Sequence, residues 1–125
     1  MKIFPVRKHR MQGSHLLADF FGVAKEKLRD REKLMRVLCA ALKKKGFSII
    51  RKTGSYKFQG GGQGVTGFVL LAQSHAAFHS YPEWNYIALD VYSCGGYDPG
   101  PIAEAMEQYL RPRRMKIVFQ KRGRK

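Results

Sequence analysis

The stretch that decides the fold runs from residue 64 to residue 95 and reads GVTGFVLLAQSHAAFHSYPEWNYIALDVYSCG. It holds three largely apolar segments with short breaks between them: residues 65–73, 75–81 and 84–92. In the last of these, Ile87, Leu89 and Val91 alternate with other residues, which is the pattern of a strand with one buried face. Because short links join neighbouring antiparallel strands, the stretch predicts a β-meander.

The sequence before this stretch predicts two strands and a helix. The strands cover residues 15–21 and 47–58, and a glycine-rich link lets the second of them pair antiparallel with residues 65–73. The helix is capped by Asp30 and runs to Lys45, where a glycine can end it. Its apolar residues recur at helical spacing: Leu34, Leu38, Ala41 and Leu42.

The sequence after residue 95 predicts a second helix, a last strand and a tail. Pro99 and Pro101 open the helix. Its apolar stripe consists of Ile102, Ala105, Met106 and Tyr109. The strand contains three alternating apolar residues: Met115, Ile117 and Phe119. The tail from Lys121 onward is predicted to be disordered.

Strands with two interspersed helices and no βαβ rhythm indicate the α+β class. We expect a two-layer sandwich in which two helices cover one face of an antiparallel sheet. The length of 125 residues fits one domain. We divide it into a basic segment over residues 1–12, a folded core over 13–120 and a basic tail over 121–125. Because the other face of the sheet is left bare, we also expect a partner, in the simplest case a second copy.

Basic residues dominate the charge but are missing from the middle of the chain. The sequence has 24 Lys and Arg against 9 Asp and Glu, a formal charge of +15, and a pI near 10.2. Such a charge is typical of nucleic-acid-binding proteins, so a basic binding protein of this kind is one hypothesis. Residues 58–110 contain no Lys or Arg, and no zinc-ligand spacing, helix-turn-helix or aromatic RNA-binding motif accompanies the basic tail. Nucleic acid is therefore the less favoured partner.

The two cysteines, Cys39 and Cys94, are too few for a disulfide framework. A reducing compartment is the default, and we expect the protein in the cytoplasm. The apolar run over residues 16–23 is too short for a membrane span, and Asp19 interrupts it. Neither a signal peptide nor a membrane partner is expected.

Four residues with reactive side chains lie in the central stretch: Thr66, Ser74, His79 and Cys94. Hydroxyl, imidazole and thiol groups could provide a nucleophile, a base and a proton donor. Because side chains alternate along a strand, His75, His79 and Tyr81 share a face and could line a pocket. The same residues could equally serve structure alone, with Ser74 in a turn, His79 on a sheet and Cys94 in the core. Residue types by themselves leave both interpretations open.

Four motifs follow one another within residues 13–120: Gly64-Val65-Thr66-Gly67, Gln73-Ser74-His75, Phe78-His79-Ser80-Tyr81-Pro82-Glu83 and Asp90-Val91-Tyr92-Ser93-Cys94-Gly95. Their order and spacing resemble the prokaryotic S-adenosylmethionine decarboxylase proenzyme family. That family's pattern has Ser where Thr66 stands, Glu where Gln73 stands and Trp where Tyr81 stands. Several motifs at matching spacing are far more specific than any single one.

The resemblance implies a cofactor that the chain makes from itself. Self-cleavage between Gln73 and Ser74 would give a β-chain of residues 1–73 and an α-chain of residues 74–125. Ser74 would be the nucleophile and would become a covalent pyruvoyl group, and His79 would remove the serine α-proton. The pyruvoyl ketone would act as the electron sink for decarboxylation.

The resemblance also assigns the remaining site residues. The Thr66 hydroxyl would stabilise the oxygen of the ester intermediate, and Cys94 would return a proton to the substrate after carbon dioxide leaves. Phe58 and Tyr81 would stack on adenine, and Glu83 would bind the ribose hydroxyls. No metal is expected.

The function implied is conversion of S-adenosylmethionine to its decarboxylated form, the aminopropyl donor for spermidine. The expected assembly is a homodimer in which each pocket takes Phe58 from the neighbouring protomer. Changes at Gln73 and Tyr81 keep two alternatives open: a pyruvoyl-dependent ornithine or arginine decarboxylase of the same superfamily, and an uncleaved, inactive homologue.

Overall fold

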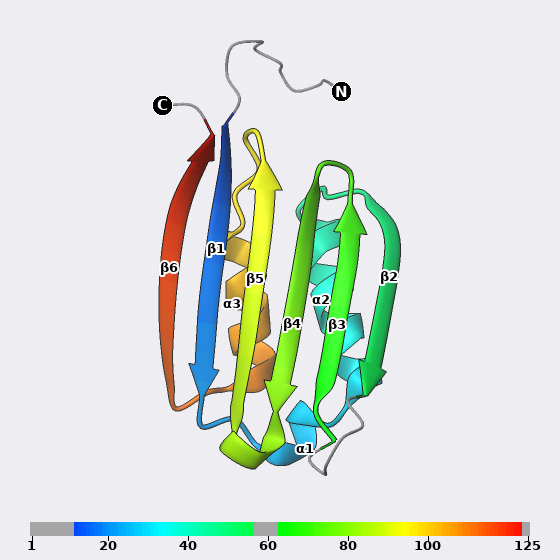
Figure 1. Ribbon diagram of the computed structural model, residues 1–125, viewed down its shortest axis with the longest axis vertical. Coiled ribbons are helices and arrows are strands. Elements are labelled where there is room, and N and C mark those ends of the chain that lie inside the picture. Colours follow the sequence, from blue (N-terminus) through cyan, green and yellow to red (C-terminus); the bar gives the residue numbers. More distant parts are fainter. Residues whose placement is uncertain (1–11, 57–62, 124–125) are drawn as a thin grey trace.

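In the part of the chain that the structure describes, six strands form one antiparallel sheet, and the helices lie against one of its faces (Figure 1). The computed structural model describes residues 12–56 and 63–123. The strands are β1 (Gln12–Phe21), β2 (Ile49–Tyr56), β3 (Val65–Leu71), β4 (Ser74–Tyr81), β5 (Tyr86–Cys94) and β6 (Arg114–Gly123). The helices are α1 (Lys25–Leu28), α2 (Arg31–Lys44) and α3 (Gly100–Leu110), with a 3-10 turn, η1 (Pro82–Trp84). Across the sheet the strands follow the order β2-β3-β4-β5-β1-β6.

The predicted meander is formed by β3, β4 and β5. Leu71 of β3 lies opposite Ser74 of β4, so only two residues link these strands. Pro82 has no N–H to continue the β4 ladder and instead begins η1, which Asn85 ends with a φ of 53°. The strand predicted from residue 84 therefore begins at Tyr86.

The core lies between the sheet and the helices α2 and α3. Burial alternates along the strands, and in β3 the core-facing residues are Val65, Gly67, Val69 and Leu71. Leu38 of α2 and Met106 of α3 are fully buried against this face. Asp30 caps α2 as predicted, because its carboxylate accepts a hydrogen bond from the Lys33 backbone N–H at 3.0 Å. Among the described residues, no helix has both the length and the apolar character needed to cross a membrane.

Besides shifts of a few residues at strand ends, the structure differs from the prediction in the tail and in one short helix. The disorder predicted from Lys121 is wrong for residues 121–123, because β6 continues to Gly123 by pairing with Gln12 at the start of β1. The short helix α1 was not expected, since its four residues are too few to show a helical repeat. Residues 1–11, 57–62 and 124–125 lie outside the described residues, and with them Phe58 and most of the basic N-terminal segment.

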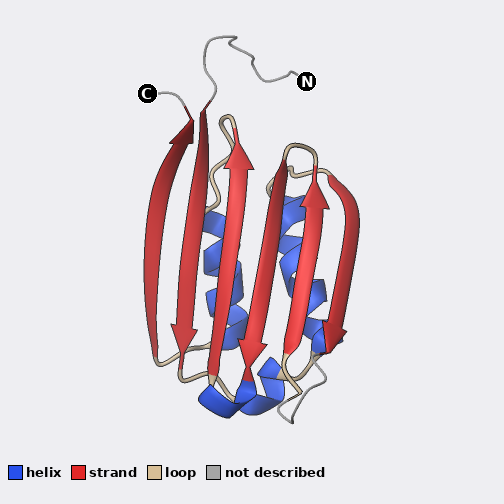
Figure 2. Ribbon diagram, in the orientation of Figure 1, coloured by secondary structure: helices blue, strands red, loops and turns tan. Residues whose placement is uncertain are grey.

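The face of the sheet without helices, here called the open face, is turned toward the viewer in Figure 2. Alternation along β1 sends Leu16, Ala18 and Phe20 into the core and the residues between them to the open face. Several apolar side chains of the open face stay partly exposed: Leu17, Phe68, Leu70 and Val118, at 39–43%. The bare face expected from the sequence is thus present, and it is not wholly polar.

Candidate active site

The turn between β3 and β4 places Ser74 at the start of a strand. Ala72 and Gln73 form the turn, and Gln73 has a φ of +65°. A left-handed backbone costs a residue with a side chain about 1–2 kcal/mol, so the hairpin holds Gln73 in a strained conformation. Ser74, whose nitrogen shares a peptide bond with the Gln73 carbonyl, is 8% exposed.

Cys94, the last residue of β5, lies next to this turn. Its backbone N–H donates to Ser74 Oγ at 3.1 Å, and its thiol donates to Gln73 Oε1 at 3.6 Å. We call Gln73, Ser74 and Cys94 the serine group. It brings a hydroxyl, the carbonyl that precedes it and a thiol together, which is the set that an acyl shift with a nearby proton donor needs. The other cysteine, Cys39, is buried in the core, and burial raises the pKa of its thiol.

Thr66 and His79 form a second pair, here called the histidine group, toward the other ends of β3 and β4. The two residues are partners across the strands, and Thr66 Oγ1 lies 3.0 Å from His79 Nδ1. His79 is exposed on the open face. The hydrogen bond orients the imidazole and leaves Nε2 available to exchange a proton.

Four aromatic side chains continue from the histidine group across the sheet. Tyr81 stacks on Trp84 with ring centroids 5.3 Å apart and on Tyr86 at 5.6 Å. Tyr86 in turn stacks on Phe21 at 5.3 Å. We call Phe21, Tyr81, Trp84 and Tyr86 the aromatic row. Glu83, which lies between Tyr81 and Trp84 in the sequence, is exposed beside it.

The Phe21 end of the aromatic row carries charged partners. The Tyr86 hydroxyl donates to Asp19 Oδ1 at 2.6 Å. Burial and this hydrogen bond raise the pKa of Tyr86 to about 12, so the phenol keeps its proton at neutral pH. The Arg114 guanidinium lies 4.1 Å from the centroid of Phe21. At the opposite end of the row, the Trp84 side chain is 67% exposed.

Within one protomer the serine and histidine groups are far apart. Ser74 and His79 are five residues apart on β4, which is a rise of about 16 Å in an extended strand. Their side chains also point to opposite faces, since Ser74 is buried and His79 is exposed. The structure therefore pairs Ser74 with Cys94 and Thr66 with His79, and it does not gather all four residues in a single protomer.

The sequence model of the family described as S-adenosylmethionine decarboxylase matches residues 14–123. The chain therefore belongs to the S-adenosylmethionine decarboxylase family. It is 38% identical over 114 residues to the S-adenosylmethionine decarboxylase proenzyme of Persephonella marina, an alignment that covers 89% of this chain and 82% of that protein. It is 36% identical over 99 residues to the proenzyme of Thermoplasma volcanium, covering 79% and 72%.

A solved structure of the S-adenosylmethionine decarboxylase family has the same fold. The crystal structure of the adenosylmethionine decarboxylase from Aquifex aeolicus superposes with a TM-score of 0.75 at 34% identity. The superposition covers 90% of this chain and 92% of that chain. The resemblance read from the four motifs and the predicted α+β class are both confirmed.

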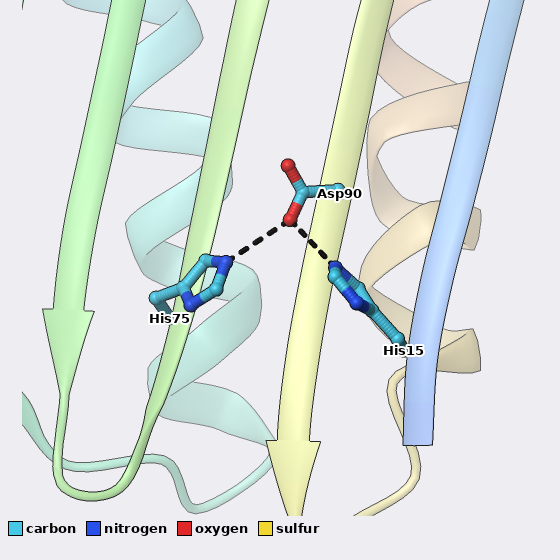
Figure 3. A group of neighbouring side chains, drawn as sticks. All are labelled: His15, His75 and Asp90. Carbon is cyan, nitrogen blue, oxygen red and sulfur yellow. Dashed lines mark hydrogen bonds and ion pairs between the residues drawn. The ribbon is translucent and has the colours of Figure 1, made fainter. Parts of the chain in front are cut away.

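Sequence reasoning misses one polar group of this S-adenosylmethionine decarboxylase family member. Asp90 of β5 lies between His15 of β1 and His75 of β4 (Figure 3). Asp90 Oδ1 lies 2.9 Å from His15 Nε2 and 3.1 Å from His75 Nε2. The alternation that buries Leu89 and Val91 also sends Asp90 to the open face, so a signal for a polar residue there was available. Its pairing with His15 depends on the strand order, which local periodicity does not give.

Proposed function

We propose that the chain is the proenzyme of an S-adenosylmethionine decarboxylase. It cleaves itself between Gln73 and Ser74, and the processed protein converts S-adenosylmethionine to the decarboxylated aminopropyl donor for spermidine synthesis. The observation that carries the proposal is the serine group, in which the Ser74 hydroxyl directly follows a strained residue whose carbonyl it would attack. The relatives described above are proenzymes by name.

The cleavage needs no reagent beyond the chain and water. Ser74 Oγ attacks the carbonyl carbon of Gln73, the amide bond between them breaks, and an ester with a free amine on Ser74 results. Removal of the Ser74 α-proton by His79 then expels the Gln73 carboxylate. The enamine left at residue 74 takes up water and releases ammonia, which leaves a ketone. Thr66 is placed beside His79 and would donate its hydroxyl to the developing oxyanion.

The surroundings of Ser74 fit a pyruvoyl group. The position is 8% exposed, so the fold shields it from water. The Cys94 backbone N–H, which donates to Ser74 Oγ in the uncut chain, loses that acceptor when the oxygen leaves with the Gln73 carboxylate. When formed, the pyruvoyl carbonyl supplies an electron sink for the loss of carbon dioxide from an α-amino acid. The thiol of Cys94, partly buried beside Gln73, would return a proton to the substrate carbon.

A second copy of the chain would complete the site. The proposed chemistry requires the serine group to meet the histidine group, and one protomer holds them about 16 Å apart. If two open faces pack with their strands antiparallel, the β3–β4 turn that carries Gln73 and Ser74 lies at the same end of the interface as the histidine group of the partner, with the Ser74 side chain on the core side of its strand. Such an interface would also bury Leu17, Phe68 and Val118. We infer an isologous homodimer with two equivalent sites.

The aromatic row supports a substrate that carries adenosine. Tyr81 lies next to the histidine group and stacks on Trp84, whose side chain is 67% exposed, so the two rings together would form the aromatic surface for adenine. The Tyr81–Trp84 stack thus supplies an indole close to the position where the family pattern has Trp. Glu83 could accept hydrogen bonds from both ribose hydroxyls, and aromatic faces attract a sulfonium cation. Phe58, assigned to the same pocket by resemblance, lies outside the described residues.

Intact-mass spectrometry of the purified protein tests the cleavage. We expect two fragments that meet between Gln73 and Ser74, with the second lacking the amine that Edman degradation requires. The Ser74→Ala variant should stay a single chain. A wild-type chain that remains whole after prolonged warm incubation would overturn the proposal and favour the inactive homologue.

The substrate is tested by carbon dioxide release from cleaved protein. S-adenosylmethionine, ornithine and arginine are assayed side by side, and S-adenosylmethionine should have the highest specificity constant. A higher value for ornithine or arginine would overturn the adenosine roles of Tyr81 and Glu83.

A further inference from the structure

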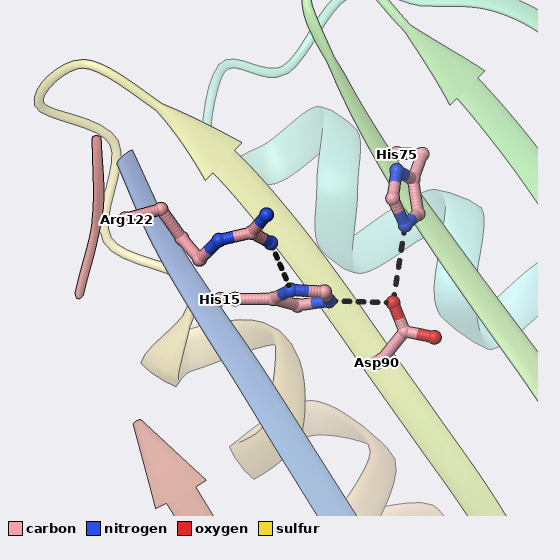
Figure 4. A network of polar contacts seen from close by, with 4 residues as sticks. All are labelled: His15, His75, Asp90 and Arg122. Carbon is pink, nitrogen blue, oxygen red and sulfur yellow. Dashed lines mark hydrogen bonds and ion pairs between the residues drawn. The ribbon is translucent and has the colours of Figure 1, made fainter. Parts of the chain in front are cut away.

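Four side chains form a hydrogen-bonded network on the open face (Figure 4). One of them, His75, directly follows Ser74 of the serine group in the sequence. Arg122 Nη1 lies 3.0 Å from His15 Nδ1, and His15 Nε2 lies 2.9 Å from Asp90 Oδ1. The same oxygen lies 3.1 Å from His75 Nε2. We call Arg122, His15, Asp90 and His75 the anchor network. It joins β6, β1, β5 and β4, which are consecutive neighbours in the sheet, starting from the edge strand β6.

The donors in the anchor network fix where its protons lie. A guanidinium has only N–H donors, so His15 Nδ1 accepts from Arg122 and carries no proton. His15 therefore holds its proton on Nε2 and donates it to Asp90. His75 also donates from Nε2, because a carboxylate only accepts. Each contact then has one donor and one acceptor.

These protons distinguish a hydrogen-bonded network from a metal site. His15, His75 and Asp90 offer ligand atoms that lie within 4.8 Å of one another, and two imidazoles with a carboxylate suit a transition-metal ion. A metal would need the Nε2 lone pair of both histidines, and His15 would then carry its proton on Nδ1, facing the N–H of Arg122. Two donors would oppose each other, so the contact with Arg122 favours the hydrogen-bonded network.

His75 is held on three sides. Asp90 binds one edge of the ring. One neighbouring ring is Phe68, stacked at 5.7 Å with an interplanar angle of 21°. The other is Tyr92, stacked at 6.0 Å and 28°. Because His75 is the residue after Ser74, an immobilised imidazole restrains the backbone that carries the Ser74 nitrogen.

We propose that the anchor network positions the peptide bond between Gln73 and Ser74 for self-cleavage, acting through His75. The inference rests on the proposed function and adds positioning residues to it. Attack on the Gln73 carbonyl requires Ser74 Oγ to lie about 3–3.5 Å from the carbon along an aligned approach, and a displacement of about 1 Å can cost about 100-fold in rate. The Cys94 backbone N–H fixes the Ser74 side chain, and His75 fixes the chain that follows it.

The rate of self-cleavage in variants of Asp90 tests the proposal. The full-length proenzyme is purified in denaturant, refolded and followed by intact mass, with hydroxylamine in parallel samples to trap the ester. Asp90→Ala removes the acceptor that both histidines share and should slow ester formation by between about tenfold and about 100-fold. Asp90→Asn keeps an oxygen in the place of Oδ1 and should recover most of the rate. Conversion of the ester to the ketone should keep its wild-type rate in both variants.

Arg122→Met tests the far end of the network and has a matched control in Lys116→Met. Both residues are cations on β6, and alternation puts both on the open face. Arg122→Met should slow ester formation less than Asp90→Ala does, and Lys116→Met should leave the rate unchanged. Unfolding temperatures are measured in a Ser74→Ala background, where no variant can cleave.

Several results would overturn the proposal. One is an Asp90→Ala chain that unfolds at a lower temperature but forms ester at the wild-type rate, since that indicates a purely structural role. Another is accumulation of ester in the Asp90→Ala variant, which would indicate that the network acts in the elimination step and not in ester formation. If EDTA abolishes cleavage and Zn²⁺ restores it, the three residues are metal ligands. A wild-type chain that does not cleave would refute the proposed function itself, and the role of the network with it.

Discussion

Gln73 contributes both a strained backbone and a polar side chain to the serine group. Its φ of +65° strains the residue whose carbonyl would be attacked in the proposed cleavage, and its Oε1 accepts a hydrogen bond from the Cys94 thiol. The Glu of the family pattern would put a negative charge beside that thiol, whereas Gln keeps an acceptor without the charge. Because the proposed attack is on the backbone carbonyl, the change from Glu is compatible with cleavage.

Replacing Gln73 with glycine should show separately how the strained backbone affects the stability of the fold and the rate of self-cleavage. Gln73→Gly adopts a positive φ at little cost, so in a Ser74→Ala background it should raise the free energy of unfolding by up to about 1 kcal/mol. With Ser74 present, the same change should slow cleavage. Thermal unfolding and intact mass measure the two effects. The control is Ala72→Gly, the turn residue without a positive φ, which should destabilise; equal losses in both variants would show that Gln73 is not strained.

Cys94→Ala should impair turnover without preventing cleavage or substrate binding. Loss of the proposed proton donor should lower kcat by about 100-fold or more and lead to inactivation by transamination, because the proton is returned slowly or at the wrong carbon. Steady-state kinetics and mass spectrometry of the treated α-chain measure this. Cys39→Ala is the control, since Cys39 is the other cysteine and lies in the core. Unchanged turnover in Cys94→Ala would remove that residue from the mechanism.

Tyr86 should make the stability of the fold depend on alkaline pH. Its pKa is raised from 10.0 to about 12, chiefly by burial and then by the hydrogen bond to Asp19. The folded state therefore keeps a proton that the unfolded chain loses first, so this contribution is complete below about pH 10 and is lost as the pH rises toward 12. Denaturant unfolding at several pH values should show a smaller alkaline decline for Tyr86→Phe than for wild type. Parallel declines would contradict the assignment.

At the scale of elements, the sequence predicts those helices and strands whose formation depends on residues close together in the chain. The cap and apolar stripe locate α2, and alternation locates β3, β4 and β5 and says which face each residue takes. Local pattern also places Ser74 beside the turn. It gives the reacting residue and its neighbours in sequence, but not their partners in space.

The elements that sequence reasoning misplaces depend on contacts between distant segments. β6 extends to Gly123 because β1 supplies a partner there. The basic residues from Lys121 onward show no apolar alternation that would predict a strand. Arg122 enters the anchor network for the same reason. The distance between Ser74 and His79, by contrast, could be predicted from the sequence. The two residues are five positions apart in one strand, and the rise per residue of a strand gives their separation.

Gly67→Ala should disturb the packing of β3 on β4. A Cβ at Gly67 would lie 2.4 Å from Phe78 Cε2 and 2.8 Å from Met35 Sδ, so the ring would have to move. We expect a loss of about 1–3 kcal/mol in the free energy of unfolding, measured with urea in a Ser74→Ala background. Gly96→Ala is the control, because a Cβ there meets nothing within 4 Å. Similar losses in both variants would mean that Gly67 is not a point of close packing.

At the scale of the whole molecule, a site shared between protomers predicts complementation. Ser74→Ala lacks the nucleophile and His79→Ala lacks the base, so each homodimer should be inactive. A mixed dimer joins the Ser74 of one protomer to the His79 of its partner and should cleave and turn over substrate at one of its two sites. The two variants are given different tags, co-expressed and purified through both tags. Mixed dimers without activity would place each site within one protomer.

The strand order has a consequence for the protein after cleavage. The peptide bond proposed to be cleaved lies between β3 and β4. After cleavage, β1, β2 and β3 would belong to one chain and β4, β5 and β6 to the other. Because β1 lies between β5 and β6, the two chains would be interleaved, and parting them would break the ladders β3–β4, β5–β1 and β1–β6. The cut would therefore leave the native assembly in place. Refolding would be impaired instead, since the two denatured fragments must meet by diffusion and β1 must insert between β5, which still pairs with β4, and β6, whose described ladder is with β1 alone. In the uncut precursor these strands all belong to one chain.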